Sequence, residues 1–222
     1  MSLTIHPIMA QSFAVIDREI GAHNFSPQEY AIVRRVIHST ADFEFKDLIR
    51  FSLGAIDAGI AAIRRRAPIV TDVGMVKQGI VGLVEQTFAN PVISALEGIG
   101  EPLPGKTRTE TGLLKCWQEY PQGIFVFGNA PTALLALCQE IPKASVSPAL
   151  VIGAPVGFIS VVESKMTLAA TQVPQIRVEG RKGGSPVAAA ILNALVCLAT
   201  EEGGRGAEGQ RGRGAEGQGE KF

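Results

Sequence analysis

From Pro68 onward, short apolar runs alternate with longer stretches of helical periodicity. The runs are nearly continuous in apolar residues, as expected for strands that are covered on both faces. They span residues 68–72, 91–95, 123–127, 149–152 and 175–178. Helical spacing is found over residues 73–84, 109–119, 131–141, 161–170 and 186–200. This alternation predicts a three-layer α/β/α domain with a mainly parallel five-stranded sheet.

An N-terminal helical segment precedes the predicted sheet. Ser26 is suited to be an N-cap, a proline follows it, and Glu29 is placed to complete a capping box. Near the predicted end of this helix, Arg35 and His38 are three residues apart and share a face. Imidazole exchanges protons near neutral pH, which makes His38 a candidate proton donor. The alternative is that His38 only packs against its neighbours.

Glycine-rich turns and polar side chains follow the predicted strands. They occupy residues 71–72, 105–109, 128–132, 153–158 and 180–185. Glycine allows close approach of the backbone to a ligand, and the helix that follows directs free amides toward an anion. Ligands of parallel α/β sheets bind at this edge, so the pattern favours a large ligand with several anionic groups. The alternative is that these glycines only make tight turns.

One of these turns matches a phosphate-binding pattern. Residues 100–107, GEPLPGKT, fit GxxxxGK[ST], and Asp72 at the end of an earlier strand could then serve magnesium. However, Pro102 and Pro104 lack the backbone N–H groups that such a loop wraps around phosphates. The loop also follows the second predicted strand and not the first. A nucleotide-binding protein is therefore a minor alternative.

Composition excludes several kinds of partner. The 222 residues are 46% hydrophobic, enough for one sizeable core, and 21 basic residues balance 21 acidic ones. No overall field therefore attracts nucleic acid or a membrane surface. The three cysteines lack metal-site spacing and are typical of buried thiols in a reducing compartment. There is no signal-peptide pattern, and the apolar stretch 187–199 is too short to span a bilayer, so we expect a cytoplasmic protein.

The composition changes at the C-terminal end. RGAEGQ occurs twice, at 205–210 and 213–218, among almost no apolar residues. Such a segment cannot bury enough surface to order itself. We therefore expect one domain over residues 1–200 and a disordered Gly/Arg/Glu-rich tail over residues 201–222. RNA or partner binding by the tail is an alternative, although its glutamates cancel the arginine charge.

Several long motifs carry a resemblance to one family. In chain order they are VRRVIHSTADFEF, APIVTDVGMVKQGI, KTRTETGLLKCW, IFVFGNAPTALLAL, PALVIGAPVGFISVVESKMTL and GRKGGSPVAAAILNAL. Their order and spacing resemble those of precorrin-8X methylmutases, and of the cobalt-precorrin-8 methylmutases, of corrin-ring biosynthesis. The resemblance runs from about Ile8 to Ala199. GNAPTAL, and PVGF followed by ESK, make it specific.

The resemblance implies an isomerase without cofactor or metal site. Such an enzyme moves a methyl group from carbon eleven to carbon twelve of the tetrapyrrole and yields hydrogenobyrinate, or cobyrinate in the cobalt series. It also implies a homodimer with active sites at the interface. The essential histidine of the family corresponds to His38, which would protonate or hydrogen-bond a ring nitrogen. Its substrate-contacting serine and arginine correspond to Ser12 and Arg35.

The carboxylate arms of such a substrate suit several polar residues at the predicted strand ends. The candidate cations are Arg108, Lys165 and Arg181, for which a solvated surface role is the alternative. The candidate hydrogen-bonding residues are Thr107, Thr109 and Asn129, which could instead cap helices. The family usually has asparagine and serine in place of Lys106 and Thr109, which leaves these local contacts open. A corrinoid carrier without turnover is a further alternative to the enzyme.

Overall fold

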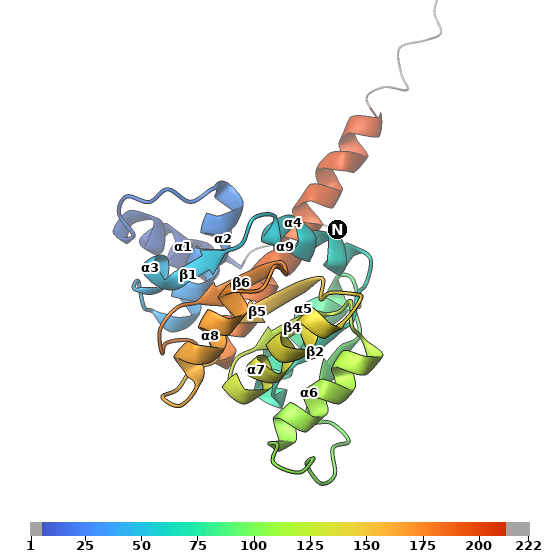
Figure 1. The fold of residues 1–222 in the computed structure, drawn as a ribbon. Helices are drawn as coiled ribbons and strands as arrows, with labels where there is room; N and C mark the ends of the chain where they lie inside the picture. The colour runs from blue at the N-terminus through green and yellow to red at the C-terminus, as the bar shows by residue number, and fades with distance from the viewer. Residues whose placement is uncertain (1–5, 212–222) are drawn as a thin grey trace, which may run out of the picture.

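The computed structural model describes the backbone of residues 6–211 and the side chains of residues 6–201. Within that range the chain forms a six-stranded sheet in the order β1-β6-β5-β4-β2-β3, with helices on both faces (Figure 1). The strands are β1 (Ile49–Phe51), β2 (Ile69–Thr71), β3 (Val92–Ser94), β4 (Ile124–Phe127), β5 (Leu150–Gly153) and β6 (Gln175–Val178). All neighbouring strands are parallel except β1 and β6.

The helices form two layers around the sheet. They are α1 (Pro7–Glu19), α2 (Pro27–Thr40), α3 (Phe45–Leu48), α4 (Ala55–Arg64), α5 (Gly74–Gln86), α6 (Arg108–Glu119), α7 (Pro131–Glu140), the 3₁₀ helix η1 (Ile141–Lys143), α8 (Val161–Ala169) and α9 (Ser185–Arg211). Helix α9 packs with α2, α4 and α5 on one side, while α6, α7 and α8 pack together on the other. The predicted three-layer α/β/α architecture and the N-terminal helical segment are confirmed.

Both faces of the central strands are buried. In β4, the side chains of Ile124 and Val126 belong to the core under α9, and those of Phe125 and Phe127 belong to the core under α6 and α7. All four side chains are fully buried. Successive side chains point to opposite faces, so a strand covered on both sides must be apolar at every position. This is why the continuous apolar runs predicted these strands well.

The sheet has one strand more than the five that the sequence pattern predicted. Strand β1 has only three residues, and Arg50 stands at its centre, so it lacks an apolar run. It pairs antiparallel with β6, with Ile49 opposite Val178 and Phe51 opposite Ile176. Pairing with β6 at the sheet edge creates this strand, and local sequence carries little signal for such a contact.

Helix α9 extends further than the predicted helix 186–200. Its backbone continues to Arg211, and Figure 1 shows this end projecting away from the domain. Helix propagation is easier than nucleation, and the buried part of α9 supplies the nucleus. The first part of the predicted tail therefore continues the helix. The rest, residues 212–222, lies outside the described residues, and its disorder stays a prediction.

The order of the strands reverses between β2 and β4. Strand β3 lies on one side of β2, whereas β4, β5 and β6 follow on the other side. Helix α5, which follows β2, packs with α9, and α7, which follows β4, packs on the opposite face. The two chain segments thus diverge at the carboxyl ends of β2 and β4. Such a switch point is the usual ligand crevice of an α/β sheet. Among the described helices, none combines the length and apolarity needed to cross a membrane.

Candidate active site

The predicted site residues fall into two groups with two further residues between them. The α1–α2 region carries Ser12, Arg35 and His38. The switch-point region comprises the ends of β2 and β4 and the N-termini of α6 and α7, and it carries Thr107, Arg108, Thr109 and Asn129. Lys165 is on α8, and Arg181 follows β6, the strand next to β5 and β1.

His38 lies in the last turn of α2 with an exposed side chain. Its imidazole contacts the ring of Phe13 on α1, edge to face, with centroids 5.3 Å apart and an interplanar angle of 76°. Across residues 6–201 the structure gives this imidazole no hydrogen bond. Both ring nitrogens are therefore available to a ligand, and either can donate or accept according to the tautomer.

Phe13 is held in turn by an arginine that sequence reasoning missed. The guanidinium of Arg34 lies 4.4 Å from the centroid of the Phe13 ring and pairs with Asp17 at 3.1 Å. The hydroxyl of Tyr30 donates to the same carboxylate. Burial, with the hydrogen bond to Asp17, raises the pKa of Tyr30 to about 12. Arg34 thus supports the ring against which His38 packs, and the adjacent arginines of the sequence were its only signal.

Arg35 and Ser12 make contacts within the protein. The Nη1 atom of Arg35 donates to the sulfur of Cys197 on α9, at 3.4 Å. The hydroxyl of Ser12 donates to the carbonyl of Ile8 one turn earlier, at 3.0 Å. Neither contact joins these side chains to His38. The family resemblance predicts that Arg35 holds a carboxylate of the substrate while His38 handles the proton, and this stays a prediction about the substrate-bound protein.

The N-terminus of α6 is capped by its own residues. The hydroxyl of Thr107 accepts the Glu110 N–H at 3.1 Å, and the Glu110 carboxylate accepts the Thr107 N–H at 3.4 Å. The Thr107 hydroxyl also lies 3.3 Å from that of Thr132 at the start of α7. Arg108 donates to the carbonyl of Ile99 at 3.0 Å. For Thr107, the structure shows the capping alternative.

Asp72 occupies the switch point with a fully buried side chain. Its Oδ2 atom accepts the backbone N–H groups of Gly128, Asn129 and Ala130 at 3.0, 2.6 and 2.7 Å. Its Oδ1 atom has no partner among the described residues. Burial raises the pKa of the Asp72 carboxyl, and the amide hydrogen bonds oppose that shift. The sequence pattern predicts that the backbone amides before α7 bind an anionic group of a ligand. In the structure they donate to the carboxylate of Asp72 instead.

These contacts also bear on the phosphate-loop pattern at residues 100–107. Asp72, the proposed magnesium residue, is buried and bound to backbone amides. Lys106, the proposed phosphate residue, pairs with Glu110 at 2.5 Å. At the start of α6, the backbone N–H groups of Thr107 and Glu110 donate to side chains of the capping box. The polar groups that a nucleotide site would need are thus each bound to other groups of the protein.

Lys165 is almost fully buried, with 2% of its surface exposed. Its ammonium donates to the carbonyls of Gly180 and Lys182, at 2.9 and 2.7 Å. Burial lowers the pKa of Lys165 to about 8. The structure therefore places this candidate substrate residue against the loop after β6. Arg181 in that loop is exposed, 5.5 Å from the centroid of the Phe158 ring.

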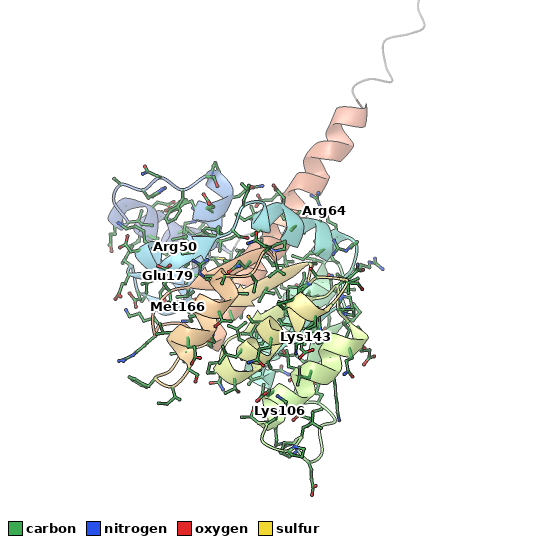
Figure 2. The ribbon with its side chains drawn as sticks, in the orientation of Figure 1. Arg50, Arg64, Lys106, Lys143, Met166 and Glu179 are labelled. Atoms are coloured by element: carbon green, nitrogen blue, oxygen red, sulfur yellow. The ribbon has the colours of Figure 1, made fainter. Side chains whose placement is uncertain are left out.

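A cavity of about 270 Å³ lies beside Lys165, between α8 and the end of β6. The other residues that line it are Val162, Met166, Ala169, Arg177, Glu179 and Gly180. Figure 2 shows Met166 and Glu179 on the side of the molecule that also carries Arg50, whose guanidinium pairs with Glu179 at 2.9 Å. This cavity is small and partly apolar, which suits a fragment of a ligand better than a whole macrocycle.

Comparison with known proteins identifies the family of this chain. The sequence model of one family, described as precorrin-8X methylmutase, matches residues 7–198 of this chain. The chain belongs to the precorrin-8X methylmutase family. Members of this family are isomerases of cobalamin biosynthesis. The match covers nearly all of the predicted domain 1–200 and ends before the predicted tail.

Individual relatives of the precorrin-8X methylmutase family agree with the match. A cobalt-precorrin-8 methylmutase of a Synechocystis species is 56% identical over 212 residues, which cover 89% of this chain and 98% of the relative. A precorrin-8X methylmutase of Pseudomonas aeruginosa is 40% identical, over 85% of this chain and 93% of the relative. The solved structure of precorrin-8X methylmutase from Thermus thermophilus superposes with a TM-score of 0.82 at 43% identity, covering 89% of this chain and 100% of that one.

The precorrin-8X methylmutase fold places the candidate cations and hydroxyls along the carboxyl edge of the sheet. Over the described residues, no group of three or more His, Cys, Asp and Glu side chains could hold a metal ion. His38, in the α1–α2 region, is exposed and makes no hydrogen bond within residues 6–201, so its imidazole is free to donate to or accept from a ligand. The arrangement suits recognition of a polyanionic substrate and proton transfer to it.

Proposed function

We propose that the protein moves a methyl group from carbon eleven to carbon twelve of precorrin-8X or cobalt-precorrin-8, giving hydrogenobyrinate or cobyrinate. The observation that carries this proposal is the family match over residues 7–198, together with relatives named for both substrates. The structure supports the proposal because the imidazole of His38 makes no hydrogen bond within residues 6–201 and can therefore bind a ligand. The 56% identical relative is named for the cobalt substrate, so we propose that substrate as the preferred one.

The reaction is intramolecular, so the methyl donor and acceptor carbons arrive already joined. The protein must fix the shape of the ring, exclude water and stabilise one protonation state. His38 would donate a proton or a hydrogen bond to a ring nitrogen and so bias the conjugated system toward migration. The edge-to-face contact with Phe13 would limit how far the imidazole can turn.

The carboxylate arms of the substrate would bind to side chains around the carboxyl edge of the sheet. Arg181 and Asn129 are exposed and suited to direct contact. Arg35 makes one long contact to a sulfur, which a substrate carboxylate would readily replace. Lys165 would act through the loop whose carbonyls it binds. Direct contacts from Ser12, Arg108 and Thr109 are part of the same proposal, whereas Thr107 would serve as the cap of α6.

We also propose a homodimer with shared active sites, in the cytoplasm. The loop before α8 and α8 itself expose large apolar side chains next to Arg181; their exposed fractions are 81% for Phe158, 82% for Ile159 and 68% for Met166. Contiguous exposed apolar surface is typical of an interface. The three cysteines are free thiols, which agrees with a reducing compartment.

The test of the reaction is an anaerobic spectrophotometric assay with each substrate in turn. We expect the purified protein to convert cobalt-precorrin-8 to the corrin chromophore, and to convert the metal-free substrate more slowly. Tight binding of the product without conversion of either substrate would instead establish the carrier alternative. Faster conversion of the metal-free substrate would overturn the proposed preference.

The test of the dimer is light scattering on the wild type and on Phe158→Asp/Ile159→Asp. One chain has a mass of 23.4 kDa, and we expect the wild type at twice this mass and the variant at the single mass. Leu53→Asp is the control, because Leu53 is even more exposed but lies between β1 and α4. A monomeric wild type would contradict the proposal.

A further inference from the structure

The turn that ends α2 is joined to the loop that follows β6 by one cation. The Nζ atom of Lys182 lies 2.6 Å from Oδ2 of Asp42 and 2.6 Å from Oε2 of Glu44. Asp42 is four residues after His38 in the sequence. This ion pair therefore connects the candidate catalytic helix to the carboxyl edge of the sheet.

The loop after β6 is anchored on its inner side. The buried ammonium of Lys165 donates to the carbonyls of Gly180 and Lys182. Gly183 packs so closely that an added Cβ would lie 2.3 Å from the carbonyl oxygen of Ala154. Lys182 thus has a backbone position fixed by the core, and its side chain extends from that fixed point to α2.

The turn after α2 has weaker support of its own. Ala41 has a positive φ of 53°, a conformation that costs a residue other than glycine about 1 kcal/mol. The N–H of Asp42 donates to the hydroxyl of Thr40 at 3.3 Å, and the N–H of Glu44 donates to Asp42 at 2.9 Å. The carboxylates of Asp42 and Glu44 share Lys182 and would repel each other without it. Lys182 therefore offsets this repulsion and joins the turn to the loop after β6.

His38 lies in the last turn of α2, directly before this segment. Within residues 6–201 its imidazole contacts the Phe13 ring and makes no hydrogen bond that would hold it independently. A shift of the last turn of α2 would move the imidazole relative to a substrate. Displacement of a catalytic group by about 1 Å can lower a rate by about a hundredfold.

We infer that Lys182 is a positioning residue for His38, which acts by fixing the turn after α2 to the loop after β6. The inference rests on the proposed function, because it concerns how His38 meets the tetrapyrrole. Exposed ion pairs contribute little to stability, so the effect of Lys182 lies in the geometry of the site. Lys182 would act without contacting the substrate.

The experiment compares Lys182→Met with the double variant Asp42→Asn/Glu44→Gln. The first variant removes the cation, and the second removes its partners and leaves the cation free. We expect kcat to fall about tenfold or more in both, with KM changed less than about threefold, because His38 is misplaced in each. Lys182→Arg can still bridge two carboxylates and should keep nearly all of kcat.

A direct substrate contact by Lys182 predicts a different pattern. Lys182→Met would then raise KM, and the double variant would keep its kcat; that result would overturn the inference. An unchanged kcat in Lys182→Met would overturn it as well. The matched control is Lys143→Met, which breaks the 2.8 Å pair with Glu140 on the opposite face of the sheet from α2 and should leave kcat unchanged.

A second measurement does not depend on turnover. The NMR resonances of the His38 ring protons, assigned with His38→Ala, report where the imidazole lies relative to the Phe13 ring. We expect Lys182→Met and the double variant to shift these resonances and Lys143→Met to leave them in place. Unshifted resonances in a folded Lys182→Met would overturn the positioning role. Absence of turnover by the wild type would instead overturn the proposed function alone.

Discussion

The α1–α2 region and the switch-point region use their polar groups in opposite ways. In the α1–α2 region the exposed imidazole of His38 rests on Phe13 and makes no hydrogen bond within residues 6–201. At the switch point, Asp72 accepts three backbone N–H groups, and Thr107 and Glu110 cap each other. Polar groups already paired within the protein have little left to offer a ligand. Changes in the first region should therefore alter turnover, and changes in the second should alter stability.

The largest expected effect is that of His38→Ala on turnover. General acid catalysis contributes about 10²–10⁴-fold to a rate, so kcat should fall by at least about a hundredfold. The side chain is exposed, and the melting temperature should stay close to that of the wild type. His23→Ala is the control, because His23 is also exposed and stacks on Tyr30, 4.5 Å away. Equal turnover in both variants would remove His38 from the mechanism.

The next effect is that of Asp72→Ala on stability. Loss of the carboxylate leaves three backbone N–H groups at the switch point without their acceptor. Each unsatisfied buried group costs about 1–3 kcal/mol, so the free energy of unfolding should fall by about 3 kcal/mol. Asp72→Asn keeps an acceptor oxygen and should lose less. Urea denaturation measures both, and equal losses in the two variants would show that the hydrogen bonds are unimportant.

A smaller effect concerns the pH dependence of stability through Lys165. Its pKa is lowered from 10.5 to about 8 in the folded protein, so between these values the unfolded chain binds more protons than the folded one. Stability must then rise with pH through that window. Relative to Lys165→Met, the wild type should gain about 2 kcal/mol between pH 7.5 and pH 9.5. Cysteines and tyrosines titrate in both proteins and cancel in this comparison.

Urea denaturation of wild type and Lys165→Met at the two pH values measures this difference. A constant difference would mean that the carbonyls of Gly180 and Lys182 compensate fully for burial of the charge. Lys143→Met serves as the control, since Lys143 lies on the surface and its removal should give no such dependence on pH.

The smallest effect is that of Thr107→Ala. An N-cap hydroxyl contributes about 1 kcal/mol, and its loss should lower the free energy of unfolding by that amount, whereas Thr107→Ser should be nearly neutral. KM should change little in either variant, because the hydroxyl is bound within the capping box. A raised KM with unchanged stability would place Thr107 in contact with the substrate and weaken the contrast between the two regions.

The local pattern of the sequence was sufficient for most of the fold. Strands such as β4, buried on both faces, must be apolar throughout, and caps such as Ser26 with Glu29 satisfy the amides of their own helix. These are properties of neighbouring residues, and they predicted five strands and the α/β/α layers. Long motifs added the family, and with it His38 as the candidate catalytic residue.

Tertiary structure decided which polar groups are free. The sequence shows Asp72, Lys165 and Thr107 as equally available. In the structure Asp72 is bound to amides far along the chain, Lys165 is bound to carbonyls of the loop after β6, and Thr107 caps its own helix. It also created β1, whose pairing with β6 joins residues more than a hundred positions apart. Hydrogen bonds of this range depend on how the whole chain packs, and no local pattern encodes them. For the same reason, the link from Lys182 to Asp42 became visible only in the folded molecule.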